Sequence, residues 1–292
     1  MSANATLQIN APKTSAPVID GKLEDACWQQ TEWKTNFTIL NKTKVLAAQQ
    51  TRFKTVHDNN FLYIAVEFDE PNINGLKAQA TKRDGKVYHD DCVEIFVDAN
   101  RDKSSYKHFC FNSIDTVYDE ERRQGGHVGT VLWNSADVKN ASTKQQNKWL
   151  MEISIPFVEL GINGKTTWGM NVTRNRQASG KAQFSTFVPL TGGFQEPANF
   201  ADLNLKDADL SKFSWDVKAP YDLRTVSMNG EKVLTGKTFI TNKTGKFCFV
   251  KWIASLASGG EQIQTFALDN NLGKEYSFAV PVGENGSTIL TM

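Results

Sequence analysis

Long apolar runs, blocks of like charge and clustered metal ligands are all missing from this sequence. No apolar run approaches the ~18–20 residues that a membrane-spanning helix needs, so we expect no membrane span. The 33 basic and 32 acidic side chains leave a formal net charge of +1, and no block of five or more like charges occurs. Because nucleic acids are recognised through clustered positive charge, we expect no nucleic-acid partner.

The sequence also lacks the motifs of common metal and catalytic sites. Its four cysteines are Cys27, Cys92, Cys110 and Cys248. They show no C-x-x-C spacing, which argues against a structural zinc ion. No G-x-S-x-G, H-E-x-x-H, Walker or G-x-G-x-x-G motif occurs, so we expect no catalytic activity.

Short alternating segments are what the sequence has in abundance. Thr51 to Val56 and Phe61 to Phe68 alternate apolar and polar residues about an Asp-Asn-Asn turn, which predicts a β-hairpin. Val93 to Val97 and Tyr106 to Asn112 predict a second hairpin, with Asp98 to Ser105 as its loop. Further strands are predicted at Trp149 to Ile155, Trp168 to Arg174 and Phe184 to Val188. Helix signals are confined to Leu23 to Trp28 and Pro156 to Leu160.

Successive strand side chains point to opposite faces of a sheet, which assigns faces in the second hairpin. The apolar face predicted for the core is formed by Val93, Ile95, Val97, Phe109 and Phe111. The opposite face then carries Cys92, Glu94 and Phe96 from one strand and His108, Cys110 and Asn112 from the other. A register with Cys92 opposite Cys110 would place Glu94 directly opposite His108.

A polar break near Leu205 to Pro220 divides the chain. Fresh strand-like runs follow it at Lys232 to Leu234, Lys237 to Thr241, Phe247 to Ala254, Gln262 to Leu268 and Tyr276 to Val280. Many short strands separated by Gly, Asn and Asp turns favour an all-β protein. We therefore predict one β-sandwich over residues 1–207 and a smaller immunoglobulin-like β-sandwich over residues 215–292.

Five short strings, in order, resemble the family 9 carbohydrate-binding modules, a branch of the DOMON-like β-sandwiches. They are Pro17 to Trp28, Val56 to Val66, Asp90 to Asp98, Trp149 to Phe157 and Pro197 to Leu203. The most specific is Asp90 to Asp98, where the family carries a D-x-V-E strand ending in aspartate. The resemblance covers about residues 15–205, and it implies a sandwich that binds a saccharide or polysaccharide as an accessory to an attached or partner catalytic domain.

The resemblance also implies a site. Family members hold a sugar between two aromatic side chains, and the matching positions here are Tyr88 and Phe194. Glu94 matches a carboxylate at the rim of the site, and strand parity places His108 on the same face. We expect Arg174, Asn175 and Arg176 to complete the rim, although ion pairing within the protein is an equal alternative for the two arginines.

Calcium is possible but not required. Asp98, Asn100 and Asp102 space oxygen ligands at alternate positions, as calcium loops do, but the glycine at position six and the closing glutamate are missing. A plain polar hairpin loop is the alternative interpretation. The first sixteen residues contain one lysine and no apolar segment, so no signal peptide is visible. The resemblance alone therefore favours an extracellular or periplasmic location.

Three other functions compete with sugar binding. A haem-binding relative needs an axial His or Met, and the candidates are His57, His89, His108, His127, Met151 and Met170. A purely structural or interaction module would need no ligand. A glycoside hydrolase needs two carboxylates, for which Glu94 with Asp115 or Glu152 could be nominated. Nothing in the sequence places such a pair across a sugar.

Overall fold

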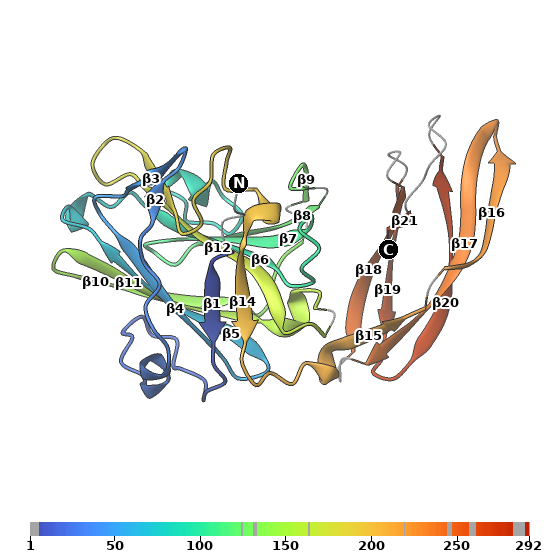
Figure 1. Cartoon of the computed structure of the whole chain (residues 1–292), viewed down its shortest axis with the longest axis horizontal. Helices are drawn as coiled ribbons and strands as arrows, with labels where there is room; N and C mark the ends of the chain where they lie inside the picture. The colour runs from blue at the N-terminus through green and yellow to red at the C-terminus, as the bar shows by residue number, and fades with distance from the viewer. Residues whose placement is uncertain are drawn as a thin grey trace. The chain divides into compact units, whose positions relative to one another are not determined.

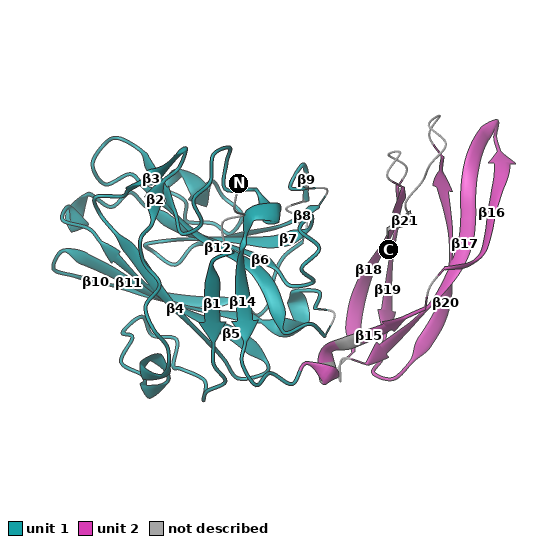
Figure 2. Ribbon diagram, in the orientation of Figure 1, with its two compact units in different colours: residues 1–209 teal, residues 210–292 magenta. Residues whose placement is uncertain are grey.

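The computed structural model describes residues 6–123, 125–130, 133–162, 164–218, 220–243, 247–256, 261–282 and 290–291. The chain forms two compact units, Met1–Asp209 and Leu210–Met292 (Figure 2). Almost all regular structure in the described ranges is β-strand, and the helices are 3-10 turns of three to five residues. None of these helices has the length and apolar content that crossing a lipid bilayer requires.

The first unit has two sheets that form two layers, as Figure 1 shows. The larger sheet has the order β3-β2-β13-β12-β6-β7-β8-β9, with β14 beside β12 and β1 beside β14. The bounds of these strands are β1 (Gln8–Ala11), β2 (Thr38–Ile39), β3 (Lys42–Leu46), β6 (Cys92–Asp98), β7 (Tyr106–Asn112), β8 (Val117–Arg123), β9 (Val128–Thr130), β12 (Thr167–Arg176), β13 (Gln183–Thr186) and β14 (Ala201–Leu205). The smaller sheet has the order β10-β11-β5-β4 and contains β4 (Thr51–His57), β5 (Phe61–Asp69), β10 (Lys139–Gln145) and β11 (Lys148–Pro156).

The apolar face predicted for the second hairpin is in the core. Its side chains on β6 and β7, including Val93, Ile95 and Phe109, are 0% exposed. Aromatic contacts join the two layers, since Phe157 after β11 meets Trp168 of β12 edge-on with ring centroids 5.0 Å apart. The all-β sandwich predicted from the sequence is therefore confirmed for this unit. The opposite face of the hairpin is also covered, because Cys92 and Phe96 are 0% exposed.

The predicted register of that hairpin is wrong by two residues. Glu94 pairs with Cys110, and Phe96 pairs with His108. The loop is longer than a register with Cys92 opposite Cys110 allows, because the Asp102 carboxylate accepts hydrogen bonds from the backbone N–H groups of Ser104 and Ser105, both 2.7 Å long. Those two residues are thereby drawn into the turn and out of the ladder. Cys92 consequently lies opposite Asn112 and not opposite Cys110, and both cysteines are free thiols.

Short helices differ from the sequence prediction in a similar way. The expected helix over Leu23 to Trp28 is a 3-10 helix, η1 (Ala26–Gln30), and Leu23 itself has φ +59°. The predicted turn after Pro156 is η4 (Phe157–Glu159). The others are η2 (Ile73–Gly75), η3 (Val87–His89), η5 (Pro197–Asn199) and η6 (Ser211–Phe213).

The second unit contains two further sheets. In the first sheet, β17 pairs with β15, β16 and β20. In the second sheet, β18 pairs with β19 and β21. Their strands are β15 (Ser214–Val217), β16 (Tyr221–Met228), β17 (Glu231–Lys243), β18 (Cys248–Leu256), β19 (Glu261–Leu268), β20 (Gly273–Pro281) and β21 (Leu290–Thr291). Side chains from both sheets, such as Trp252, Phe278 and Leu268, form one buried cluster. The two strands predicted between Lys232 and Thr241 are a single strand, β17.

Candidate functional site

Cross-strand pairing places one row of side chains across the large sheet on the face away from the core. Thr186 of β13 pairs with Thr173 of β12, Thr173 pairs with Glu94 of β6, and Glu94 pairs with Cys110 of β7. Tyr118 of β8 pairs with Cys110 and ends the row. Paired residues point to the same face of a sheet, so Glu94 lies in the middle of this row, whose members are all buried.

A chain of buried charges runs along this face from Glu94. His108 Nε2 lies 2.6 Å from Glu94 Oε2, and His108 Nδ1 lies 2.9 Å from Glu120 Oε1. The three residues are 5%, 3% and 3% exposed. Because each ring nitrogen faces a carboxylate, both nitrogens donate and the ring is an imidazolium. Arg122 Nε lies 2.8 Å from Glu120 Oε1 and supplies the second positive charge.

The pKa values within this chain of buried charges follow from two opposed effects. Burial lowers the pKa of His108, but the hydrogen bonds to Glu120 and Glu94 outweigh burial and leave that pKa raised. Burial raises the pKa of Glu120, but the hydrogen bonds from His108 and Arg122 outweigh it and leave that pKa lowered. Two carboxylates and two cations therefore compensate one another beneath the surface.

Asn175 joins this chain from the neighbouring strand. Its Nδ2 donates to Glu94 Oε1 and to the backbone carbonyl of Tyr88, both at 2.9 Å. These two bonds fix the orientation of the amide, and its Oδ1 is buried without a partner among the described residues. Thr173 Oγ1, in the same row as Glu94, is likewise buried and has no partner there. Asn175 Oδ1 is therefore an acceptor that a hydroxyl group could use.

Aromatic side chains flank the charged chain. Tyr88, in η3, is 37% exposed and meets Tyr118 edge-on with ring centroids 5.4 Å apart. Phe194 lies against Phe96, which stacks on His108 with centroids 4.3 Å apart. Tyr88 and Phe194 thus contact different parts of one assembly around Glu94 and His108. That they form opposite walls of a cleft stays a prediction.

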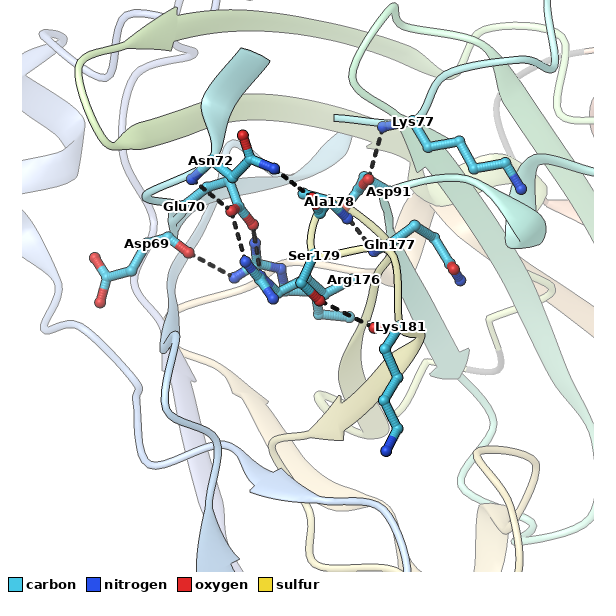
Figure 3. A network of polar contacts seen from close by, with 11 residues as sticks. Asp69, Glu70, Asn72, Lys77, Asp91, Arg176, Gln177, Ala178, Ser179 and Lys181 are labelled. Carbon is cyan, nitrogen blue, oxygen red and sulfur yellow. Dashed lines mark hydrogen bonds and ion pairs between the residues drawn. The ribbon is translucent and has the colours of Figure 1, made fainter. Parts of the chain in front are cut away.

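Arg174 and Arg176 do not lie at the rim of the site, where the sequence analysis placed them. Arg174 pairs across the sheet with Val93, so it lies on the core face, opposite to Asn175. Its Nη2 is 2.9 Å from Glu70 Oε2, and Arg176 binds the same carboxylate through Nε at 2.7 Å and Nη2 at 2.8 Å. Figure 3 shows Arg176 directed at Glu70. Side-chain alternation along β12 therefore directs both arginines to the core face, where they form an internal ion pair with Glu70. This is the alternative that the sequence left open.

Another buried carboxylate, Asp91, stabilises the end of β12 beside Asn175. It accepts hydrogen bonds from the backbone N–H groups of Lys77 at 2.7 Å and Gln177 at 2.8 Å (Figure 3). It also accepts one from Ala178 at 3.2 Å. These contacts attach the start of β6 to the turn after β12, and so hold Asn175 and the Tyr88 segment in place. Sequence reasoning missed Glu70, Asp91 and Glu120.

The predicted calcium loop satisfies its oxygens internally. Asp98 accepts hydrogen bonds from the backbone N–H groups of Asp102 at 3.2 Å and Lys103 at 2.8 Å, and Asn100 Nδ2 donates to Asp102 at 3.1 Å. Within the described ranges, no group of three or more His, Cys, Asp and Glu residues is arranged to hold a metal ion. This hydrogen bonding agrees with the polar hairpin loop considered as the alternative.

The haem-ligand candidates have other contacts in the structure. Both ring nitrogens of His108 face carboxylates, and His57 Nε2 contacts the backbone carbonyl of Lys206 at 2.8 Å. Met151 and Met170 are 0% exposed. His89 and His127 lie on the surface.

Comparison with known proteins gives one family. A family model described as "Carbohydrate family 9 binding domain-like" matches residues 19–208. Endo-1,4-beta-xylanase A of Thermoanaerobacterium saccharolyticum is 29% identical over 202 residues, which cover 68% of this chain and 16% of that protein. Exoglucanase XynX of Acetivibrio thermocellus is 29% identical over 159 residues, covering 54% and 13%. The chain therefore spans about a sixth or less of these relatives.

Two solved structures have the same fold as the first unit. Both are a family 9 carbohydrate-binding module from Caldicellulosiruptor kristjanssonii, one in complex with glucose and the other with cellotriose. Each is 22% identical and covers 69% of this chain. The TM-scores are 0.53 and 0.52, with 97% and 95% of the respective solved chains covered.

Proposed function

This chain belongs to the carbohydrate family 9 binding domains, and we propose that it binds a saccharide without transforming it, on the sheet face that carries Glu94. The observation that carries this assignment is the buried acceptor Asn175 Oδ1, which has no partner in the described structure and lies beside a charged chain flanked by aromatic rings. Relatives that are xylanases and neighbours solved with glucose and cellotriose support a saccharide as the ligand class.

The residues match what a pyranose offers. Its C–H faces are apolar and suit the rings of Tyr88 and Phe194, while its hydroxyls need donors and acceptors at the rim. Glu94 and Asn175 Oδ1 both accept, so two neighbouring hydroxyls could donate to them. The bond from His108 to Glu94 holds that carboxylate in one orientation before a ligand arrives, which lowers the entropy cost of binding.

Catalysis by the nominated carboxylate pairs has no support in the geometry. Glu152 lies on β11 in the other sheet, where it accepts hydrogen bonds from Trp28 Nε1 at 2.8 Å and the backbone N–H of Gly21 at 2.9 Å. Asp115 lies in a turn and accepts a hydrogen bond from Asn140 at 3.1 Å. Neither faces Glu94 as the second carboxylate of a glycosidase must.

The relatives support a place for this chain in a larger assembly. The matched enzymes are several times longer than the matched region, as expected for a binding module within a multidomain enzyme. We propose that this chain serves as an accessory module for an attached or partner enzyme that degrades polysaccharide. Such enzymes act on insoluble substrate outside the cytoplasm, so we propose an extracellular or periplasmic location.

Titration calorimetry with glucose, cello-oligosaccharides and xylo-oligosaccharides tests the proposal. One site with two aromatic side chains gains roughly 0.5–1.5 kcal/mol from each ring beyond buried area, and a similar amount from each net hydrogen bond. We therefore expect a Kd on the order of micromolar to millimolar for at least one sugar. Assays for new reducing ends should stay negative.

Substitution of the aromatic residues locates the site. Tyr88→Ala and Phe194→Ala should each weaken binding by a few-fold to about tenfold, which corresponds to up to ~1.4 kcal/mol. Tyr221→Ala in the second unit is a matched control, since Tyr221 and Tyr88 are 36% and 37% exposed. Unchanged affinity in both site variants would refute the assignment of these rings. New reducing ends that vanish in Glu94→Gln would refute the non-catalytic function.

A further inference from the structure

A groove of about 580 Å³ lies at the β2–β3 edge of the large sheet. Its lining comes from the β2–β3 hairpin, from the turn that joins β12 to β13, and from β13 itself. The residues that matter below are Lys42, Val45, Leu46, Lys181, Gln183 and Phe184. None of them belongs to the site described above.

Phe184 connects this groove to that site. Its ring meets the Phe194 ring edge-on, with centroids 6.3 Å apart, and Phe184 pairs across the sheet with Asn175. Leu46 also belongs to the same face, because it pairs with Thr38, which pairs with Thr186 of the row that contains Glu94. The groove therefore begins where the proposed site ends.

The groove combines exposed apolar surface with free polar groups. Val45, Leu46 and Phe184 are 50%, 55% and 39% exposed, although each is a residue that folding usually buries. The side chains of Lys42, Lys181 and Gln183 make no hydrogen bond or ion pair within the described ranges. No Asp or Glu lines the groove. Flat apolar surface bordered by free donors suits the ring faces and hydroxyl oxygens of a sugar.

We propose that this groove is an extension subsite for further glycosyl units of an oligosaccharide whose first unit lies against Glu94 and Asn175. The proposal rests on the proposed function. Neighbouring strands are about 4.8 Å apart, so β13 lies roughly 10 Å from β6 and β3 roughly 19 Å from it. A glycosyl unit in an extended chain advances by roughly one strand spacing. A mono- or disaccharide is thus held near Glu94, and the groove is reached from about the third unit onward.

The test is the dependence of affinity on chain length. Titration calorimetry of the full chain with glucose and with cello-oligosaccharides of two to six units should show a rise in affinity of a few-fold to about tenfold between the disaccharide and the pentasaccharide. Leu46→Ser and Lys181→Ala should abolish that rise and leave the affinities for glucose and the disaccharide unchanged. Phe184 is left intact because it contacts Phe194.

The control is Val18→Ser, since Val18 is 64% exposed and lies outside the groove. This variant should keep the wild-type dependence on chain length. If affinity is equal at every length, or if the rise survives in both groove variants, the extension subsite is refuted while the proposed function stands. If no saccharide of any length binds, both proposals fall together.

Discussion

His108 is the residue whose replacement tests the buried charge chain most directly. His108→Leu keeps a side chain of similar bulk but removes both donors, at Glu94 and at Glu120. Glu120 keeps Arg122 as a partner, so Glu94 becomes the uncompensated carboxylate, with only the neutral amide of Asn175 left to it. Removing one partner of a buried ion pair costs roughly 3–5 kcal/mol.

The pH dependence of that loss can be derived. The raised pKa of His108 contributes stability that is fully present below its unfolded value of about 6.5 and is lost as pH rises through the folded value. Between pH 4.5 and 6.5 the wild type is therefore unaffected by this group. The variant lacks this contribution at every pH. Its deficit is therefore constant over this range, and it shrinks by up to about 1.36 kcal/mol per pH unit as pH rises from the unfolded toward the raised folded pKa of His108.

Urea unfolding at pH 5.5, 6.5 and 8.5, followed by tryptophan fluorescence, measures this difference. The transition of the second unit should not change between the proteins and serves as an internal reference. His127→Leu is the matched control, because His127 is exposed and should shift stability by no more than ~0.5 kcal/mol at any of these pH values. A His108→Leu deficit that is as large at pH 8.5 as at pH 6.5, or one below about 1 kcal/mol at pH 6.5, would contradict the reasoning.

Two further predictions concern carboxylates outside the proposed site. Glu70→Gln should cost roughly 3–5 kcal/mol in urea unfolding, because Arg174 and Arg176 are 1% and 7% exposed and lose their shared carboxylate. Glu67→Gln should cost less than about 1 kcal/mol, since the side chains of its partners Arg52 and Lys148 are 41% and 38% exposed; equal losses would oppose this argument. Asp102→Ala should cost roughly 1–2 kcal/mol with or without added calcium, because two backbone N–H groups lose their acceptor. A loss seen only in calcium would instead indicate a metal site in this loop.

The fold was accessible from the sequence for the longer strands that have one apolar face, whereas the short strands β1 and β14 were not predicted, although Ile9 and Leu203 are buried. The predicted hairpin at Thr51 to Phe68 is β4 and β5, and the predicted core faces of β6 and β7 are buried. Among the other strands that were missed, two have no such face. β10 (Lys139–Gln145) is a polar edge strand that pairs with β11, and every residue of β16 (Tyr221–Met228) is exposed. Pairing with a neighbour, and not burial, defines both strands, so periodicity carries no signal for them.

Part of the site could be predicted from the sequence. Glu94, His108 and Asn175 are brought together by hydrogen bonds, as expected from one shared face. Glu120 was missed because it lies in the acidic run Asp119 to Glu121, which is typical of a solvated surface. Its position opposite His108 on β8 follows only from the pairing of β7 with β8. The division of the chain near residue 207 and an immunoglobulin-like second unit stay predictions.

The outcomes for His108 and for the arginines differ because side chains on a strand alternate with a period of two. A register error of two residues leaves every side chain on its predicted face, and long side chains still reach the diagonal neighbour. Glu94 therefore contacts His108 at 2.6 Å although Cys110 is its direct partner. An offset of one residue, in contrast, moves a side chain to the opposite face of the sheet. Trp168, Met170 and Val172 already mark the core face of β12, and the same alternation carries that face on to Arg174. Strand parity thus decides which residues can share a ligand before the register is known.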